Sequence, residues 1–171
     1  MMTRASLAFV SGLAILGVGA PLIVQPAPRL LWNASASVRI GLYAVRPEGV
    51  LHVSERVVVR PPTPLADFMA RRRYLPLGVP LLKHIAALPG AKICRIGRTI
   101  TINGHVVGRA LRTDWLRRKL PVWQGCHIVA AGQVFLMNER VKASFDGRYF
   151  GTLPTSLIVG RADPIWTCGW P

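Results

Sequence analysis

The sequence predicts a mainly β domain that follows one N-terminal transmembrane helix. Of the 171 residues 51% are apolar, and the 16 glycines and 14 prolines favour short strands joined by tight turns over a helical bundle. Several short runs are rich in β-branched residues, which are enriched in strands. After removal of an N-terminal anchor the chain is still long enough to bury the core of a single domain.

The anchor is predicted by the absence of charge between Arg4 and Arg29. These 24 positions would extend about 36 Å as a helix, which is enough for a hydrocarbon core of about 30 Å. The competing interpretation is a secretory signal peptide cleaved after Val18-Gly19-Ala20. Pro21 follows that site directly, and its fixed φ disfavours the extended conformation that a protease needs. We therefore favour an uncleaved anchor, with residues 1–28 as tail and membrane anchor and 29–171 as the second domain.

The charge distribution bears on the partners of the chain. The formal net charge is +15, from 22 Lys and Arg against 7 Asp and Glu, which is typical of proteins that meet nucleic acid or an anionic membrane surface. The basic residues are scattered, with dense runs only at 71–73 and 117–119, and no nucleic-acid-binding motif accompanies them. We expect membrane lipid as a partner and no nucleic acid.

The first elements after the anchor are a strand and a helix. Four valines between residues 53 and 59 predict a strand that ends at Pro61-Pro62. Thr63 as N-cap and Pro64 at the first helical position then predict a short helix or a mobile loop. Apolar residues at helical spacing continue this pattern to the three arginines at 71–73, which suit a helix C-terminus.

The second half of the chain predicts a hairpin and two further strands. Residues 99–102 and 105–107 flank Asn103-Gly104, the pair preferred in a two-residue type I′ turn. The apolar runs 134–137 and 157–160 are typical of buried strands.

Ser37 and Lys83 are the candidate catalytic residues. Lys83 follows the apolar run 75–82, where burial would lower the pKa of its amine and make a neutral base available. A neutral amine close to a serine hydroxyl is a Ser-Lys dyad, a known variant of the serine nucleophile.

The segments around these residues resemble a known family. They are Ser35 to Tyr43, Ser54 to Pro62, Lys83 to Gly90, and Asn138 followed by Ser144 to Gly151. In this order, after one anchor, they resemble the motifs of bacterial signal peptidase I, and most of all its TraF-type conjugal transfer branch. The S-V-x-I-G-L-Y, S-F-D-x-R-Y-F-G and closing P-x-W-T segments are characteristic of that branch. The resemblance extends roughly from Leu7 to Thr167.

The resemblance implies further roles in the site. The Ser37 backbone N–H and the Ser35 hydroxyl would form the oxyanion hole, where donors stabilise developing negative charge. Ser144 would hydrogen-bond the lysine amine, while Asp146 would pair with Arg148 and support the site.

Two positions depart from the family pattern. Arg39 stands where the branch often carries proline, which leaves local specificity open. Gly147 replaces a common serine, so one hydrogen-bonding group is missing from the support of the site.

The cysteines and histidines complete the candidate residues. Cys94 and Cys126 are expected to form a disulfide in an exported domain, with Cys168 left over; the alternative is three small buried apolar residues. The histidines share no metal-ligand spacing, so we expect no metal and no cofactor, and we interpret them as structural. They are His52, His84, His105 and His127.

These observations predict a membrane-anchored serine endopeptidase. The resemblance implies a periplasmic catalytic domain at the bacterial inner membrane, although Arg29, Arg39 and Arg46 after the span and only Arg4 before it indicate the opposite orientation. It also implies a conjugative pilin precursor as substrate, possible cyclisation of the product, and other conjugation proteins as partners. The alternatives are a general signal peptidase for exported preproteins and an inert basic membrane-anchored component of the conjugation machinery.

Overall fold

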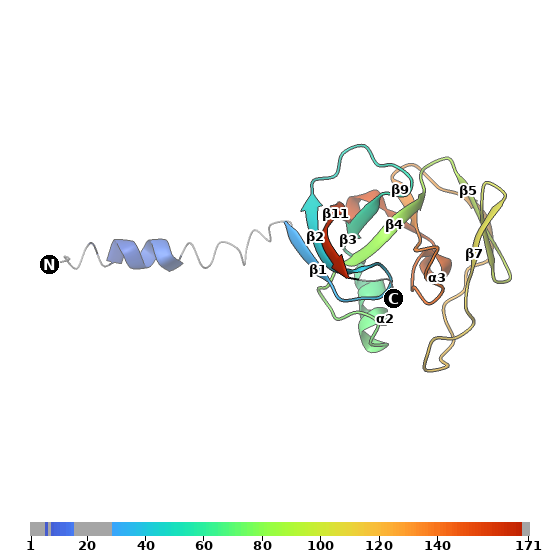
Figure 1. The fold of residues 1–171 in the computed structure, drawn as a ribbon, viewed down its shortest axis with the longest axis horizontal. Coiled ribbons are helices and arrows are strands. Elements are labelled where there is room, and N and C mark those ends of the chain that lie inside the picture. Colours follow the sequence, from blue (N-terminus) through green and yellow to red (C-terminus); the bar gives the residue numbers. More distant parts are fainter. Residues whose placement is uncertain (1–5, 7, 16–28, 169–171) are drawn as a thin grey trace.

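The computed structural model describes residues 6, 8–15 and 29–168. Residues 6 and 8–15 are helical, and the rest of the predicted transmembrane segment lies outside the described residues. Within the described part of the chain, no helix has the length and apolar character needed to cross a membrane. The mainly β class is confirmed for the part that follows, which consists of two antiparallel sheets with few helices (Figure 1).

The larger sheet has seven strands in the order β1-β2-β11-β3-β4-β9-β10. Its strands are β1 (Leu30–Asn33), β2 (Ile40–Arg46), β3 (Arg56–Val59), β4 (Leu81–Ala87), β9 (Gln133–Leu136), β10 (Thr152–Pro154) and β11 (Ile158–Cys168). The last strand, β11, pairs with β2 along most of its length and with β3 at its start, so it lies between two strands from the first part of the domain.

The smaller sheet has four strands in the order β7-β6-β5-β8. They are β5 (Lys92–Ile96), β6 (Thr99–Ile102), β7 (His105–Arg109) and β8 (Gly125–Ile128). The helical elements are α2 (Thr63–Arg71), α3 (Gly147–Phe150) and the 3-10 turn η1 (Thr155–Leu157).

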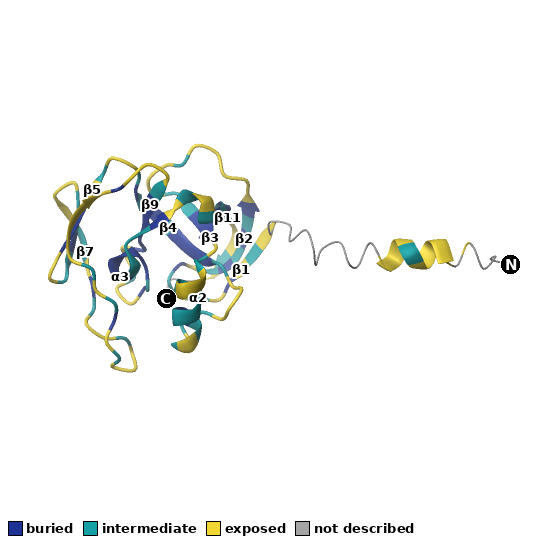
Figure 2. Ribbon diagram, turned by 180° about the vertical axis from the view of Figure 1, so that it is seen from behind, coloured by how far each residue is buried: buried dark blue, intermediate teal, exposed yellow. Residues whose placement is uncertain are grey.

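Strand β9 links the core of the two sheets because its side chains alternate between two faces. Val134 and Leu136 pack in one cluster with Val57, Val59 and α2, whereas Phe135 packs in another with side chains of the smaller sheet. Figure 2 shows β4 and β9 as the buried centre of the fold. On β4 itself, residues 81–83, 85 and 87 are buried, whereas His84 and Ala86 are partly exposed.

Most of the predicted elements are present, with shifts that have local causes. The hairpin is confirmed: Asn103 and Gly104 have φ of 49° and 85°, as a type I′ turn requires. The predicted strand at 53–59 is three residues too long, because Ser54 has a left-handed backbone (φ 72°) and Val53 is 54% exposed. The strand predicted at 134–137 is present as β9, displaced by one residue to 133–136.

Two further boundaries were wrong. The helix α2 starts one residue early: Pro62 is its N-cap, and Thr63, the predicted cap, is already helical. The strand predicted at 157–160 begins at Ile158 and continues to Cys168. A register shift between Pro164 and Trp166 lets this strand pass a proline, which cannot donate to a ladder.

Candidate active site

The loop between β1 and β2 carries Ser37, and Asn33 organises this loop. The Asn33 amide nitrogen donates to the backbone oxygens of Val38 at 3.1 Å and Arg39 at 3.0 Å. Its amide oxygen accepts from the Ser35 hydroxyl at 3.0 Å. These contacts hold the loop against the end of β1 and fix the position of Ser37.

Ser35 and Ser37 are hydrogen-bonded to each other, with 3.0 Å between their hydroxyl oxygens. A hydroxyl has one hydrogen to donate. Because the Ser35 hydroxyl donates to Asn33, Ser37 is the donor in the contact between the two serines. In this arrangement the Ser35 hydrogen points at Asn33.

Lys83 lies in the middle of the larger sheet, where β4 runs between β3 and β9. Its side chain is buried, with 3% of its surface exposed, and its Nζ donates to the Ser144 hydroxyl at 2.8 Å. Burial lowers the pKa of Lys83 to about 8, against an opposing effect of the Asp146 charge and with a further lowering by Arg148. About a tenth of the amine is therefore neutral at pH 7, and about half at pH 8.

A buried ion pair holds the segment that carries Ser144. Arg148 donates from Nη2 to Asp146 Oδ2 at 2.7 Å, and also to the backbone oxygens of Val141 at 2.7 Å and Ser144 at 3.2 Å. Asp146 accepts in addition from the backbone N–H of Asn138 at 3.1 Å. The pair thus ties the end of β9 to the segment opposite Lys83.

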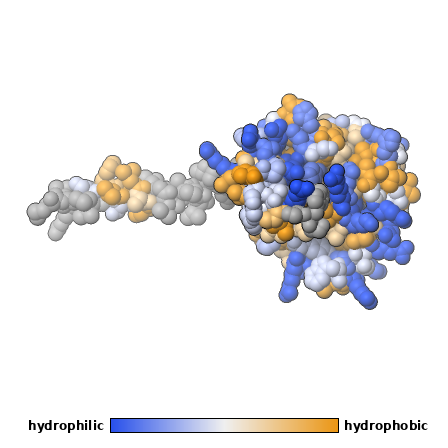
Figure 3. All heavy atoms as spheres, in the orientation of Figure 1, coloured by the Kyte–Doolittle hydropathy of each residue, from blue (hydrophilic) through white to orange (hydrophobic). Residues whose placement is uncertain are grey.

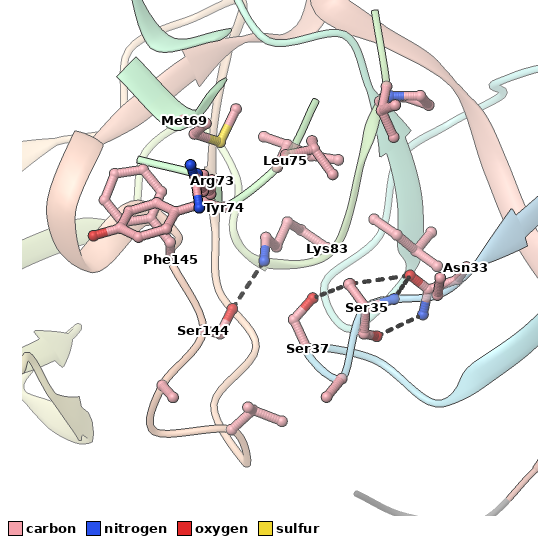
Figure 4. Close-up of a pocket in the computed structure, with 18 of the residues that line it drawn as sticks. Asn33, Ser35, Ser37, Met69, Arg73, Tyr74, Leu75, Lys83, Ser144 and Phe145 are labelled. Carbon is pink, nitrogen blue, oxygen red and sulfur yellow. Dashed lines mark hydrogen bonds between the residues drawn. The ribbon is translucent and has the colours of Figure 1, made fainter. Parts of the chain in front are cut away.

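A cavity of about 730 Å³ brings these groups together. Ser37, Lys83 and Ser144 line it, and Figure 4 shows the Lys83 amine facing the side of the cavity that carries both hydroxyls. The hydrogen bond of Lys83 goes to Ser144, and that of Ser37 goes to Ser35. Much of the remaining wall is apolar, which keeps the lysine in a medium that disfavours its charge. Apolar lining residues include Met69, Leu75, Leu81, Leu111 and Phe145.

His84 points to the other face of the sheet from Lys83, as successive residues of a strand do. It lines a second cavity, of about 490 Å³, and its Nδ1 lies 3.0 Å from Asn138 Oδ1. Burial lowers the pKa of His84, and the charges of Arg56, Lys83 and Arg140 lower it further, partly offset by the hydrogen bond to Asn138. His84 therefore takes a position beside the site without contacting the Lys83 amine.

Gly147 occupies a position where no side chain fits. A Cβ at this residue would lie 2.7 Å from the Leu136 backbone oxygen and 2.7 Å from the Phe135 ring. The Gly147 carbonyl also accepts from Trp123 Nε1 at 2.9 Å. The departure from the family pattern at this residue thus follows from close packing against β9.

Two residues that shape the site, Asn33 and Asp114, were not predicted from the sequence. Asn33 carries the hydrogen bonds that shape the Ser37 loop, but a single asparagine before a serine-rich loop gave no signal. Asp114 accepts from the Tyr74 hydroxyl at 2.6 Å and from Arg118 Nε at 2.7 Å, and so ties the 111–120 loop to the segment that follows α2 at the wall of the cavity. Tyr74 and Asp114 are 40 residues apart in sequence, so no local pattern indicates that they meet.

The predicted disulfide is present. Cys94 and Cys126 are directly opposite each other on β5 and β8, with 4.0 Å between their Cα atoms. Cys168 is exposed and carries a free thiol.

Comparison with known proteins shows the family to which this chain belongs. The model of the family "Signal peptidase, peptidase S26" matches residues 2–167. The chain therefore belongs to that family and is a serine peptidase of the signal peptidase type. Within it, the chain is a member of the TraF type, as its curated relatives indicate.

Those relatives differ in how much of their length they share with this chain. The conjugal transfer protein TraF of Agrobacterium fabrum is 37% identical over 90 residues, which are 52% of this chain and 49% of the relative. A probable conjugal transfer protein TraF of Sinorhizobium fredii is 32% identical over 149 residues, 79% of this chain and 76% of the relative. A plasmid transfer protein TraF of Escherichia coli is 25% identical over 177 residues, 97% and 99% of the two chains.

Among solved structures, a signal peptidase I from Enterococcus faecalis is similar with a TM-score of 0.40 and 18% identity. The match covers 66% of this chain and 97% of that structure.

Proposed function

We propose that Ser37 and Lys83 form the catalytic Ser-Lys dyad of an endopeptidase. The observation that carries this proposal is a buried lysine with a pKa of about 8 in the same cavity as the Ser37 hydroxyl. A base is most effective when its pKa is close to the working pH. Lys83 meets this condition, whereas an exposed lysine, with an ordinary pKa of about 10.4, would be almost fully protonated.

In the proposed reaction the neutral Lys83 amine accepts the proton of the Ser37 hydroxyl while Ser37 Oγ attacks the scissile carbonyl carbon. The tetrahedral intermediate collapses with cleavage of the C–N bond, and the Lys83 ammonium gives its proton to the leaving amine. Water then attacks the Ser37 ester, loses a proton to Lys83, and the proton returns to Ser37 Oγ as the acid product leaves. Ser144, 2.8 Å from the amine, orients Lys83 through these steps.

The oxyanion would be bound by the Ser37 backbone N–H and the Ser35 hydroxyl. The Ser35 hydroxyl donates to Asn33 in the free enzyme. Substrate binding therefore has to redirect this hydrogen from Asn33 to the carbonyl oxygen, a rotation about one side-chain bond.

We propose a protein precursor of a conjugation apparatus, specifically a pilin precursor, as the substrate. The support is the family membership together with the names of the relatives, which are conjugal or plasmid transfer proteins. Other proteins of that apparatus are the proposed partners.

The proposed location is the inner membrane, with residues 29–171 as the periplasmic peptidase domain and 1–28 as its anchor. Apolar side chains are exposed where the domain begins: Leu30 and Trp32 on β1, and Trp166 on β11, whose ring stacks on Trp32 with centroids 6.0 Å apart. Figure 3 shows a hydrophobic patch where the described domain begins. Such indole rings suit the membrane–water interface.

The test is cleavage of a candidate pilin precursor by the detergent-solubilised full chain, read by intact mass. Ser37→Ala and Lys83→Ala should each abolish cleavage while circular dichroism stays unchanged, and Lys92→Ala, an exposed lysine on β5, should cleave normally. Turnover by a folded Ser37→Ala or Lys83→Ala protein would refute the dyad. A wild-type chain that never acylates at Ser37 would be the inert component instead.

The same spectra report the fate of the acyl-enzyme. We propose that the α-amine of the substrate can replace water as the attacking group, since a tethered amine reaches a high effective concentration. A product lighter by one water than the linear cleaved chain would be the cyclic form. A product of full hydrolytic mass with a free N-terminus would make the enzyme a plain hydrolase.

A further inference from the structure

Ser37 lies between two cavities of different character. The apolar cavity with Lys83 is on one side, and the second cavity, of about 490 Å³, is on the other; Ser37 and Val141 line both. A peptide whose scissile carbonyl is at Ser37 therefore extends toward the second cavity on one side of the scissile bond. The residues of that second cavity can contact substrate side chains there and contribute to sequence specificity.

The second cavity is cationic. Three arginines line it, Arg39, Arg56 and Arg140, against one carboxylate, Glu139. The positive charge affects His84, which lines the same cavity. Burial is the largest cause of its lowered pKa, and the charges of Arg56 and Arg140 lower the pKa further. An anionic group in this cavity would be attracted by the same field.

Arg56 is held in place by its contacts, and one nitrogen of its guanidinium group has no hydrogen-bond acceptor in the described part of the chain. Its Nη1 donates to the Ala162 backbone oxygen at 3.1 Å, and its guanidinium lies over the Tyr43 ring, 5.3 Å from the centroid. Among the described residues, its Nε is the one buried side-chain nitrogen or oxygen that has no hydrogen-bond partner. A buried donor without an acceptor is costly, so a small shift of the side chain that brings Nε to an acceptor of a ligand would be favourable.

We propose that this cavity binds an acidic side chain of the substrate, on one side of the scissile bond, with Arg56 as the main contact. The inference rests on the proposed peptidase function. A carboxylate matches the donors of a guanidinium and forms charge-assisted hydrogen bonds with it. Because Ser37 itself lines the cavity, an occupant in peptide linkage to the scissile bond fits better than an anionic lipid headgroup, which would compete with the substrate.

The test uses synthetic fluorogenic peptides that span the cleavage site found by intact mass. Glu, Gln or Lys is placed singly at each of the positions that flank the scissile bond on both sides. We expect Glu to exceed Gln by about fivefold in kcat/KM, the upper range for one partly exposed ion pair, at positions on one side only. The preference should fade near 1 M salt, where the Debye length is about 3 Å.

Variants assign the preference to the cavity. Arg56→Gln and Arg140→Gln should each reduce the ratio of Glu to Gln rates, and Arg56→Lys should restore part of it. Arg109→Gln removes one exposed charge from β7 in the other sheet and should leave the ratio unchanged. If Arg56→Gln does not fold, Arg140→Gln decides alone, because its side chain is exposed.

The outcomes separate this inference from the peptidase proposal. Three outcomes would overturn the acidic subsite while Ser37→Ala still abolishes cleavage. They are a ratio of one in the wild type, a preference on both sides, and a ratio that no folded variant of Arg56→Gln and Arg140→Gln lowers. Variants that change binding to anionic vesicles but not peptide selectivity would also overturn it and assign the cavity to lipid. Cleavage by Ser37→Ala would instead refute the peptidase proposal itself.

Discussion

Asp146 and Arg148 form an ion pair of 2.7 Å in which neither side chain is more than 1% exposed. Such a pair adds little net stability, because desolvation offsets the attraction. Its effect is on position: Arg148 also binds the backbone oxygens of Val141 and Ser144, and so fixes the segment that presents Ser144 to Lys83. The two charges act on the Lys83 pKa in opposite directions, which leaves burial as its main determinant.

Activity should rise with pH through the Lys83 pKa. The neutral amine is the base, and the pKa of Lys83 is about 8, so kcat/KM should increase about tenfold per pH unit below 8 and level off above it. The measurement is kcat/KM from pH 5.5 to 9.5 on a peptide without titratable side chains. A flat profile over this range would exclude a lysine base.

Replacement of Lys83 by methionine should stabilise the fold while it abolishes activity. The folded-state pKa lies below the ordinary value, from 10.5 to about 8, so the buried ammonium destabilises the protein by about 3 kcal/mol below pH 8. The penalty disappears as the pH rises from 8 toward 10.5. Loss of the hydrogen bond to Ser144 offsets part of this effect. We therefore expect the free energy of unfolding to rise by about 2 kcal/mol at pH 7.

The measurement for Lys83→Met is urea unfolding at pH 7 and pH 10, with Lys92→Met, an exposed position, as the matched control. The gain should be larger at pH 7 than at pH 10. Equal gains at both values would mean that the lysine is not charged in the folded state at pH 7.

Removal of the disulfide should destabilise the smaller sheet. Cys94 and Cys126 are 32 residues apart in sequence, and closing a loop of this size stabilises by about 3 to 4 kcal/mol in the chain-entropy account. The double variant Cys94→Ala/Cys126→Ala should show that loss in chemical unfolding. Cys168→Ala, which removes the exposed free thiol, should be neutral, and a loss of similar size there would contradict the assigned pairing.

Restoring a serine at position 147 should damage the protein. A Cβ there would meet the Leu136 backbone oxygen at 2.7 Å, and overpacking of this kind costs about 1 to 3 kcal/mol. Gly147→Ser should therefore lower both Tm and kcat, since α3 begins at this residue and carries Arg148. Gly49→Ser, where a Cβ meets nothing within 4 Å, is the control and should change neither.

The sequence determined the features that depend on neighbours along the chain. Asn103-Gly104 specified its hairpin because the turn geometry is encoded in two residues. The order of the serine, lysine and Ser144–Gly151 segments identified the family that matches residues 2–167. The membrane anchor at 1–28 remains a prediction from hydropathy, since most of it lies outside the described residues.

Only the tertiary structure decided how the site is assembled. Lys83 and Ser144 are 61 residues apart and meet because β4 and β9 are neighbours in one sheet. The environment that lowers the Lys83 pKa comes from side chains of α2, of the 111–120 loop and of the segment after β9, which line one cavity with it. Three other features also depend on the tertiary structure. They are the lack of space for a side chain at Gly147, the Ser37 loop shaped by Asn33, and the cationic cavity bordered by Arg56. Burial, close approach and electric field depend on side chains brought together from distant positions, which no local pattern encodes.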